Sequence, residues 1–146
     1  MQIENKSPRF RVAAAVFNLL DPIPFGLFVG VLIFDIIYAN SADVLWIKSA
    51  AWLVSIGLVF AIIPRFINLC YVWFGKNRAP LAVKVDFWLN VLAVVAALVN
   101  AFVHSRDAYA AMPDAIWLSL ATVGLLAAGR IILAGKNIGF KEFGHV

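Results

Sequence analysis

Cysteine, histidine and charged residues are all scarce in this chain. Its 146 residues include one cysteine, two histidines and only 14% Asp, Glu, Lys and Arg. The single Cys70 excludes an intramolecular disulfide and any metal or redox site of the CxxC type. The sequence also lacks a glycine-rich phosphate loop, an HExxH motif and an acyl-transfer triad. We therefore predict that the chain is not an enzyme and holds no resident cofactor or metal.

Apolar residues dominate instead. They make up 64% of the chain and the mean hydropathy is +0.93, whereas a soluble domain is about 45–50% apolar. A water-soluble fold of this length could not bury so much apolar surface, so the predicted solvent is lipid. The net charge of +4 would favour a nucleic-acid partner only if the basic residues clustered on a soluble face. They lie between apolar runs, which indicates a role in membrane topology and no nucleic acid.

Four apolar runs are each long enough to cross a bilayer, which takes about 20 helical residues. We predict one all-α integral membrane domain, residues 22–134, built as a four-transmembrane-helix bundle. The four predicted spans are residues 22–39, 44–66, 84–103 and 115–134.

Proline and polar residues mark where these runs begin and end. Asp21 and Pro22 are typical of a helix start, as the N-cap and the first helical residue. Pro64 is expected to kink or end the long second run. Residues 1–21 mix basic and apolar side chains, which predicts an interfacial cytoplasmic segment. Residues 135–146 are predicted to form a cytoplasmic tail.

Basic residues are unequally divided between the connections. Only Lys48 and Arg106 fall in the first and third connections; the other ten lie in the terminal segments, the middle connection and their flanks. Cytoplasmic loops carry the Lys and Arg excess, so we predict that both termini are cytoplasmic. The ten residues are Lys6, Arg9, Arg11, Arg65, Lys76, Arg78, Lys84, Arg130, Lys136 and Lys141.

A shift of 65 residues superimposes several of the rare polar and aromatic positions. We interpret the chain as two copies of one helical hairpin, related by an axis along the membrane normal. The superimposed pairs are Asp21 with Asp86, Asp35 with Asn100, Trp52 with Trp117 and Arg65 with Arg130.

This repeat gathers Asp21, Arg65, Asp86 and Arg130 in one intramembrane polar layer near the cytoplasmic face. Unpaired, each charge would cost about 2.5–3.5 kcal/mol at a helix centre and less near the interface. One interpretation is a polar site for a head group, a quinone or a proton. The other is two acid–base pairs that hold the helices together, with arginines reaching lipid phosphates and Asp21 as a cap.

A secondary polar pair, Asp35 and Asn100, is predicted one turn inside the outer face. The two side chains are expected to share a hydrogen bond that serves packing, with a ligand site as the alternative. Asn68 and Asn90 are expected to hydrogen-bond between helices. A haem would need histidine ligands at membrane depth, but His104 lies at the outer end of the third span.

Small-residue pairs on two spans allow close approach of helices. They are Gly26-xxx-Gly30 and Gly124-xxx-Ala128. Packing within the bundle is the favoured interpretation, and contact with a second copy of the chain is the alternative.

Several motifs between residues 17 and 140 also carry a family resemblance. They are Pro24-Phe25-Gly26-Leu27-Phe28-Val29-Gly30 followed by Asp35, Asp86-xxx-Asn90 through Asn100 and Arg106, Leu118-Ser119-Leu120, and the glycine-bearing end from Gly129 to Gly139. In these features the chain resembles the bacterial four-helix membrane proteins grouped as domain of unknown function 2231. The resemblance implies a bacterial inner-membrane protein and, because some relatives are joined to Rieske-type modules, a redox setting. Family members often carry histidines where Pro22 and Asp86 stand here, so any cofactor bound by those histidines is not expected in this chain.

The leading hypothesis is a small non-catalytic protein of the bacterial inner membrane that anchors or assists a larger complex, with a respiratory or redox complex as one setting. Its expected partners are the lipid bilayer and other membrane subunits or further copies of itself. Two alternatives are a quinone- or haem-associated electron-transfer subunit and a small oligomeric transporter.

Overall fold

The structure, a computed structural model, describes residues 8–74, 80–106 and 108–142. It is all-α over these residues, with five α-helices and one short 3₁₀ helix, η1. The elements are α1 (Pro8–Leu20), α2 (Pro22–Ser41), α3 (Val44–Phe74), α4 (Leu81–His104), η1 (Ala108–Ala110) and α5 (Asp114–Glu142).

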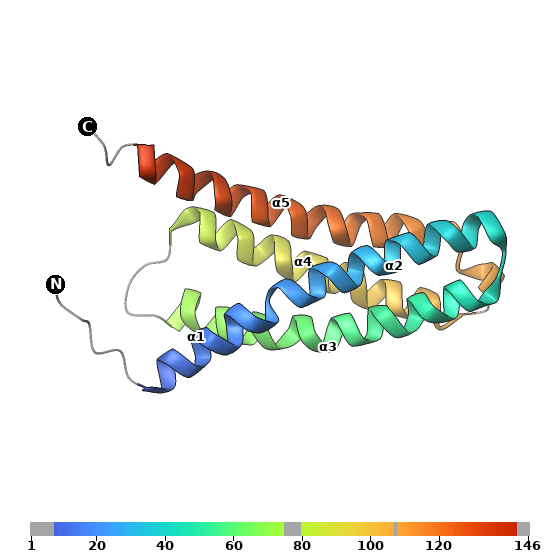
Figure 1. Cartoon of the computed structure of the whole chain (residues 1–146), viewed down its shortest axis with the longest axis horizontal. Coiled ribbons are helices and arrows are strands. Elements are labelled where there is room, and N and C mark those ends of the chain that lie inside the picture. Colours follow the sequence, from blue (N-terminus) through green and yellow to red (C-terminus); the bar gives the residue numbers. More distant parts are fainter. Residues whose placement is uncertain (1–7, 75–79, 107, 143–146) are drawn as a thin grey trace.

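Helices α2 to α5 form a four-helix bundle in which consecutive helices run in opposite directions (Figure 1). Each of the four packs against two neighbours, in the cyclic order α2, α3, α4, α5. The α2–α3 connection and η1 lie at one end of the bundle. Helix α1 and the last turns of α5 lie at the other end (Figure 1). The first and last described residues are therefore on the same side of the bundle.

Four helices are long and apolar enough to cross a membrane, as the sequence predicted. Their candidate spans are Ala15–Ser41, Val44–Cys70, Leu81–His104 and Asp114–Gly135. The predicted spans agree with these in number and order but differ at their ends. Helix α5, in particular, continues to Glu142, so part of the expected tail is helical.

Prolines act differently at the two positions singled out in the sequence. Pro64 lies inside α3, which continues for ten more residues, so of the two expected effects of Pro64, a kink or a helix end, the helix end does not occur. Pro22 does interrupt the chain, because its ring nitrogen cannot donate the bond that would continue α1 into α2. At this break Asp21 keeps helical backbone angles, and its side chain makes no capping hydrogen bond. Asp21 therefore occupies the predicted N-cap position before Pro22, but its side chain does not cap the helix.

Small buried residues let the four helices approach closely. Ala50, Ala93 and Ala97 are completely buried, and Phe28 and Val54 pack with them in the central core. Residues without large side chains at helix contacts are typical of membrane bundles, where close van der Waals packing replaces the hydrophobic effect. The centre of the bundle is consequently apolar.

The three glycines of the two small-residue pairs differ in their surroundings. A Cβ atom added at Gly30 would lie 2.8 Å from Cδ2 of the Leu53 side chain, where α2 meets α3. Gly26 and Gly124 have nothing within 4 Å of such an atom. Of these three glycines, only Gly30 lies where a neighbouring helix would contact an added Cβ atom.

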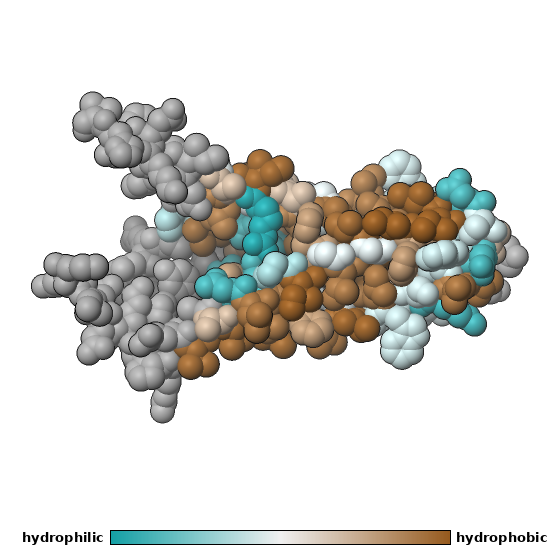
Figure 2. Space-filling model, viewed as in Figure 1, coloured by the Kyte–Doolittle hydropathy of each residue, from teal (hydrophilic) through white to brown (hydrophobic). Residues whose placement is uncertain are grey.

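The outer surface of the bundle is apolar along its length. Figure 2 shows hydrophobic residues over most of this face. Hydrophilic residues gather at the end where α2 meets α3 and in a short band towards the opposite end (Figure 2). Many large apolar side chains are exposed, including Leu92, Phe102 and Ile131. Such a surface is suited to contact with lipid, and the chain is a multi-pass membrane protein.

Candidate functional site

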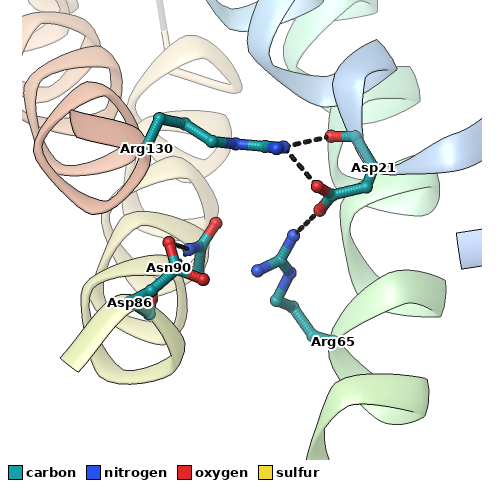
Figure 3. A network of polar contacts seen from close by, with 5 residues as sticks. All are labelled: Asp21, Arg65, Asp86, Asn90 and Arg130. Carbon is teal, nitrogen blue, oxygen red and sulfur yellow. Dashed lines mark hydrogen bonds and ion pairs between the residues drawn. The ribbon is translucent and has the colours of Figure 1, made fainter. Parts of the chain in front are cut away.

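Asp21 is the centre of the charged layer that the sequence predicted. It lies at the junction of α1 and α2 and is only 8% exposed. Its carboxylate binds Arg65 of α3 through Oδ1 and Arg130 of α5 through Oδ2, the latter at 2.5 Å. Arg130 also donates to the backbone carbonyl of Asp21 at 2.9 Å. One acidic residue thus connects three elements of the bundle (Figure 3).

The depth of this layer follows from helix geometry. Helix α2 has 20 residues after Asp21, which span about 30 Å at a rise of 1.5 Å per residue. That length is about the thickness of the hydrocarbon core. The charged layer lies towards the end of the bundle that holds the described chain ends, and Arg65, Asp86 and Arg130 each stand five residues inside a candidate span.

Asp86 lies in the same layer but is bound differently. It is 7% exposed, and the two guanidiniums of Arg65 and Arg130 are near enough to interact with it through space. Among the described residues, however, no ion pair joins it to either arginine. Its Oδ1 accepts a 2.9 Å hydrogen bond from the Asn90 side chain instead (Figure 3). The hypothesis of two separate acid–base pairs is therefore wrong: both arginines bind Asp21.

Asn90 is held by its own helix. Its Nδ2 donates to the Asp86 carboxylate and, at 2.7 Å, to the Asp86 backbone carbonyl. Both bonds lie within α4, so the expected hydrogen bond between helices is wrong for Asn90. Its Oδ1 is buried and has no hydrogen-bond partner. The layer thus contains an acceptor whose hydrogen-bonding capacity is unused.

Gly129 of α5 makes room for this pair. A Cβ atom at Gly129 would lie 2.6 Å from Asp86 Oδ1 and 3.3 Å from Asn90 Nδ2. The absence of a side chain at this position lets α4 and α5 pack closely where the polar residues stand.

Replacing Gly129 with alanine is expected to destabilise the bundle by about 1–3 kcal/mol, as overpacking of a filled contact does. The matched control is Gly124→Ala on the same helix, where the added methyl group meets open space. We expect the control to be neutral or slightly stabilising, because alanine favours helix more than glycine. Unfolding by SDS in bicelles, followed by circular dichroism, measures both. Equal effects of the two substitutions would contradict this assignment.

A second polar network lies near the other end of the bundle. His104 Nε2 is 2.8 Å from Asp35 Oδ1, and the Ser119 hydroxyl donates to Asp35 Oδ2 at 2.5 Å. Asn100 Nδ2 donates to Ser119 at 2.7 Å, and His104 Nδ1 lies 2.9 Å from the Asn100 carbonyl. These four residues form a closed ring, which we call the outer ring. It joins α2, α4 and α5.

Donor and acceptor roles in the outer ring follow from its geometry. The backbone carbonyl of Asn100 can only accept a hydrogen bond, so His104 Nδ1 carries a hydrogen. The Ser119 hydroxyl donates to Asp35 and accepts from Asn100. One further proton is therefore held between His104 Nε2 and Asp35 Oδ1. Both of these side chains have 0% relative exposure, so this charged or proton-sharing pair is shielded from solvent.

The outer ring corrects the prediction made for Asp35 and Asn100. Both residues are buried, but Ser119 bridges them in place of a direct hydrogen bond. Sequence reasoning missed Ser119 and the role of His104. The signal for His104 was its spacing of four residues from Asn100, which places both on one face of α4. Because both ring nitrogens of His104 are engaged, neither is free to bind a haem iron; His145 lies outside the described residues.

A shallow apolar groove runs between α3 and α4 beside the charged layer. It has a volume of about 210 Å³. Its lining residues are Ile62, Arg65, Phe66, Leu69, Phe87, Val91, Val94 and Val95. Arg65 is the only lining residue that also belongs to the charged layer.

Comparison with known proteins adds no relative to this description. No family model matches the chain, and no curated protein or solved structure is detectably similar to it.

Proposed function

We propose that this chain is a small non-catalytic subunit that anchors or assists a larger membrane complex. The observation that supports this proposal is the use of its buried polar groups. Asp21 joins the α1–α2 junction to α3 and α5, and the outer ring joins α2, α4 and α5. Both networks hold helices to one another, one near each end of the bundle. An apolar scaffold whose helices are joined in this way is suited to positioning partners within a membrane.

The location and setting form part of the same proposal. We propose membership of the domain of unknown function 2231 family on the motifs quoted above, and with it the bacterial inner membrane and a redox complex. The excess of basic residues supports cytoplasmic termini, at the end of the bundle where the charged layer lies. Of the ten basic residues, Lys6, Lys76 and Arg78 lie outside the described residues.

We also propose that the two hairpins are copies of one unit. Burial at the equivalent positions supports this. Asp35 and Asn100 are both fully buried, whereas Trp52 and Trp117 are both highly exposed, at 72% and 66%.

Purification of the tagged chain from its native membranes in mild detergent tests the subunit proposal. We expect a stoichiometric partner to co-purify and the native mass to exceed that of the chain and its detergent. A chain that migrates only as a monomer or as copies of itself would contradict the proposal. A visible absorption spectrum with a Soret band would contradict the non-catalytic interpretation and favour the haem-associated alternative.

Cysteine labelling tests the orientation. In a Cys70→Ser background, Ser105→Cys is expected to react with a membrane-impermeant maleimide added to intact cells, because Ser105 is exposed after α4. Gly135→Cys, which is exposed near the opposite end of the bundle, is expected to react only after the cells are opened. The reverse pattern would place the termini outside the cytoplasm. Lysed cells provide the control that both cysteines are reactive.

A further inference from the structure

We propose that the charged layer binds one ordered water molecule inside the bundle, which links Arg65 of α3 to Asn90 and Asp86 of α4. The water accepts a hydrogen bond from the Arg65 guanidinium. It donates one hydrogen bond to Asn90 Oδ1 and the other to the Asp86 carboxylate. This hydration site is independent of the subunit proposal above.

Asn90 supplies an acceptor that needs a partner. Asn90 is only 1% exposed, and its Oδ1 is buried without a hydrogen-bond donor among the described residues. Its Nδ2 already donates to the carboxylate and to the backbone carbonyl of Asp86, so exchanging the amide oxygen and nitrogen would lose both bonds. Leaving a buried acceptor unpaired is unfavourable, and buried water commonly bonds such groups in proteins. A donor from outside the chain is therefore favoured at Asn90.

Arg65 supplies donors on the opposite side of the layer. A guanidinium carries five N–H donors, and within the described part of the chain only Nη2 of Arg65 is bonded, to Asp21. Figure 3 shows the other terminal nitrogen of Arg65 turned towards the side of the layer that holds Asp86 and Asn90. The Arg65 side chain is only 12% exposed. Its remaining donors are thus largely shielded and need a partner within the layer.

The separation of the two sides suits one bridging molecule. Arg65 and Asp86 are near enough to interact electrostatically. Nevertheless, over the residues that the structure describes, they form no ion pair, and Arg65 makes no direct hydrogen bond to Asn90. A polar contact that is too long to be direct is commonly completed by a water molecule. A buried water needs two to four polar partners, and Arg65, Asn90 and Asp86 provide three.

The charge balance favours a neutral molecule over an ion. The layer contains two carboxylates, Asp21 and Asp86, and two guanidiniums, Arg65 and Arg130, so its formal charges cancel. A cation would lie beside the Arg65 guanidinium and an anion beside the Asp86 carboxylate, and either would add a charge that the layer does not balance. Water adds no charge, and it can accept from Arg65 while it donates to Asn90 and Asp86.

A crystal structure of the full-length protein grown from a lipid mesophase, at a resolution that shows ordered waters, tests this proposal. We expect one density peak at about 2.7–3.2 Å from both Asn90 Oδ1 and a nitrogen of Arg65, the range of hydrogen bonds. Contacts of about 2.3–2.6 Å from the peak to several oxygens would indicate a cation such as Ca²⁺ instead. A direct Arg65–Asn90 hydrogen bond, or well-ordered side chains with no peak between them, would also overturn the proposal.

Two leucine substitutions of buried asparagines on α4 test the role of Asn90. Asn90→Leu removes the acceptor and keeps a side chain of similar size, so we expect the density peak beside Arg65 to be lost. The matched control is Asn100→Leu. Asn100 is also 1% exposed with an unpaired Oδ1, but it belongs to the outer ring, so we expect this variant to keep the peak. A peak that persists in Asn90→Leu would show that Asn90 does not hold the water.

Nuclear Overhauser effects from water to the Asn90 side-chain amide give a second measurement, made on the wild-type protein in solution. With ¹⁵N-labelled asparagine, we expect a cross-peak between water and the Asn90 amide protons whose sign distinguishes a resident water from chemical exchange. The Asn90 resonance is assigned by its loss in Asn90→Leu. A resolved Asn90 amide resonance without such a cross-peak would contradict the hydration site.

Discussion

Replacing Asp21 with asparagine is expected to lower the free energy of unfolding by about 3 kcal/mol. The carboxylate binds two guanidiniums, so its loss removes the only acid that forms ion pairs with these two cations among the described residues. This value is the lower end of the destabilisation found when a buried ion pair is broken. We choose it because the Arg130 side chain is 42% exposed, so water screens its attraction to Asp21. SDS unfolding in bicelles measures the effect.

Asp86→Asn is the matched control for Asp21→Asn. The repeat makes the two acids equivalent in sequence, but Asp86 is bound by Asn90 and not by an arginine. An asparagine at this position can still accept that hydrogen bond. We expect a loss of less than about 1 kcal/mol. Equal losses in the two variants would contradict the assignment of both arginines to Asp21.

Replacing His104 with leucine is expected to destabilise the protein by about 3–5 kcal/mol, the range for breaking a buried charged pair. The substitution removes the partner of Asp35 Oδ1 and the donor to the Asn100 carbonyl. Asp35 is completely buried, so water cannot replace the lost contact. The same unfolding measurement applies.

A double-mutant cycle isolates the His104–Asp35 contact. The double variant His104→Leu, Asp35→Leu replaces both members with apolar groups, which is far less costly than leaving one charge alone. We expect the double variant to be less destabilised than the sum of the single variants by about 2–3 kcal/mol. Ser105→Ala is a control with an exposed hydroxyl and an expected effect within about 0.5 kcal/mol. Additive single effects would show that His104 and Asp35 do not interact.

The four spans were predictable because they depend on a local property. A run of about 20 apolar residues must be helical in lipid, whatever it packs against. The outer ring depends instead on how each helix is rotated about its axis, which a single span does not encode. Ser119 shows the difficulty. Ser49 and Ser55 donate to the carbonyl four residues before them, as serines in helices commonly do, whereas Ser119 donates to Asp35 on another helix.

The unequal roles of Asp21 and Asp86 were hidden for a related reason. The shift of 65 residues makes them equivalent, but their backbones differ. Asp21 stands at the break before Pro22, and its carbonyl accepts a bond from Arg130. Asp86 is the sixth residue of α4, and its carbonyl accepts from Asn90. A proline follows Asp21, but none follows Asp86. This difference is associated with an asymmetric charged layer, whereas the repeat in the sequence predicted a symmetric one.

Helix α5 contributes to both polar networks, and this has a consequence for biogenesis. Ser119 completes the outer ring, and Arg130 completes the contacts of Asp21. During synthesis α5 is the last of the four spans to leave the ribosome. Until it is inserted, Asp35 lacks one of its two side-chain partners within the membrane. The first three spans therefore form an incomplete intermediate, and arrival of the fourth closes the fold at both ends of the bundle.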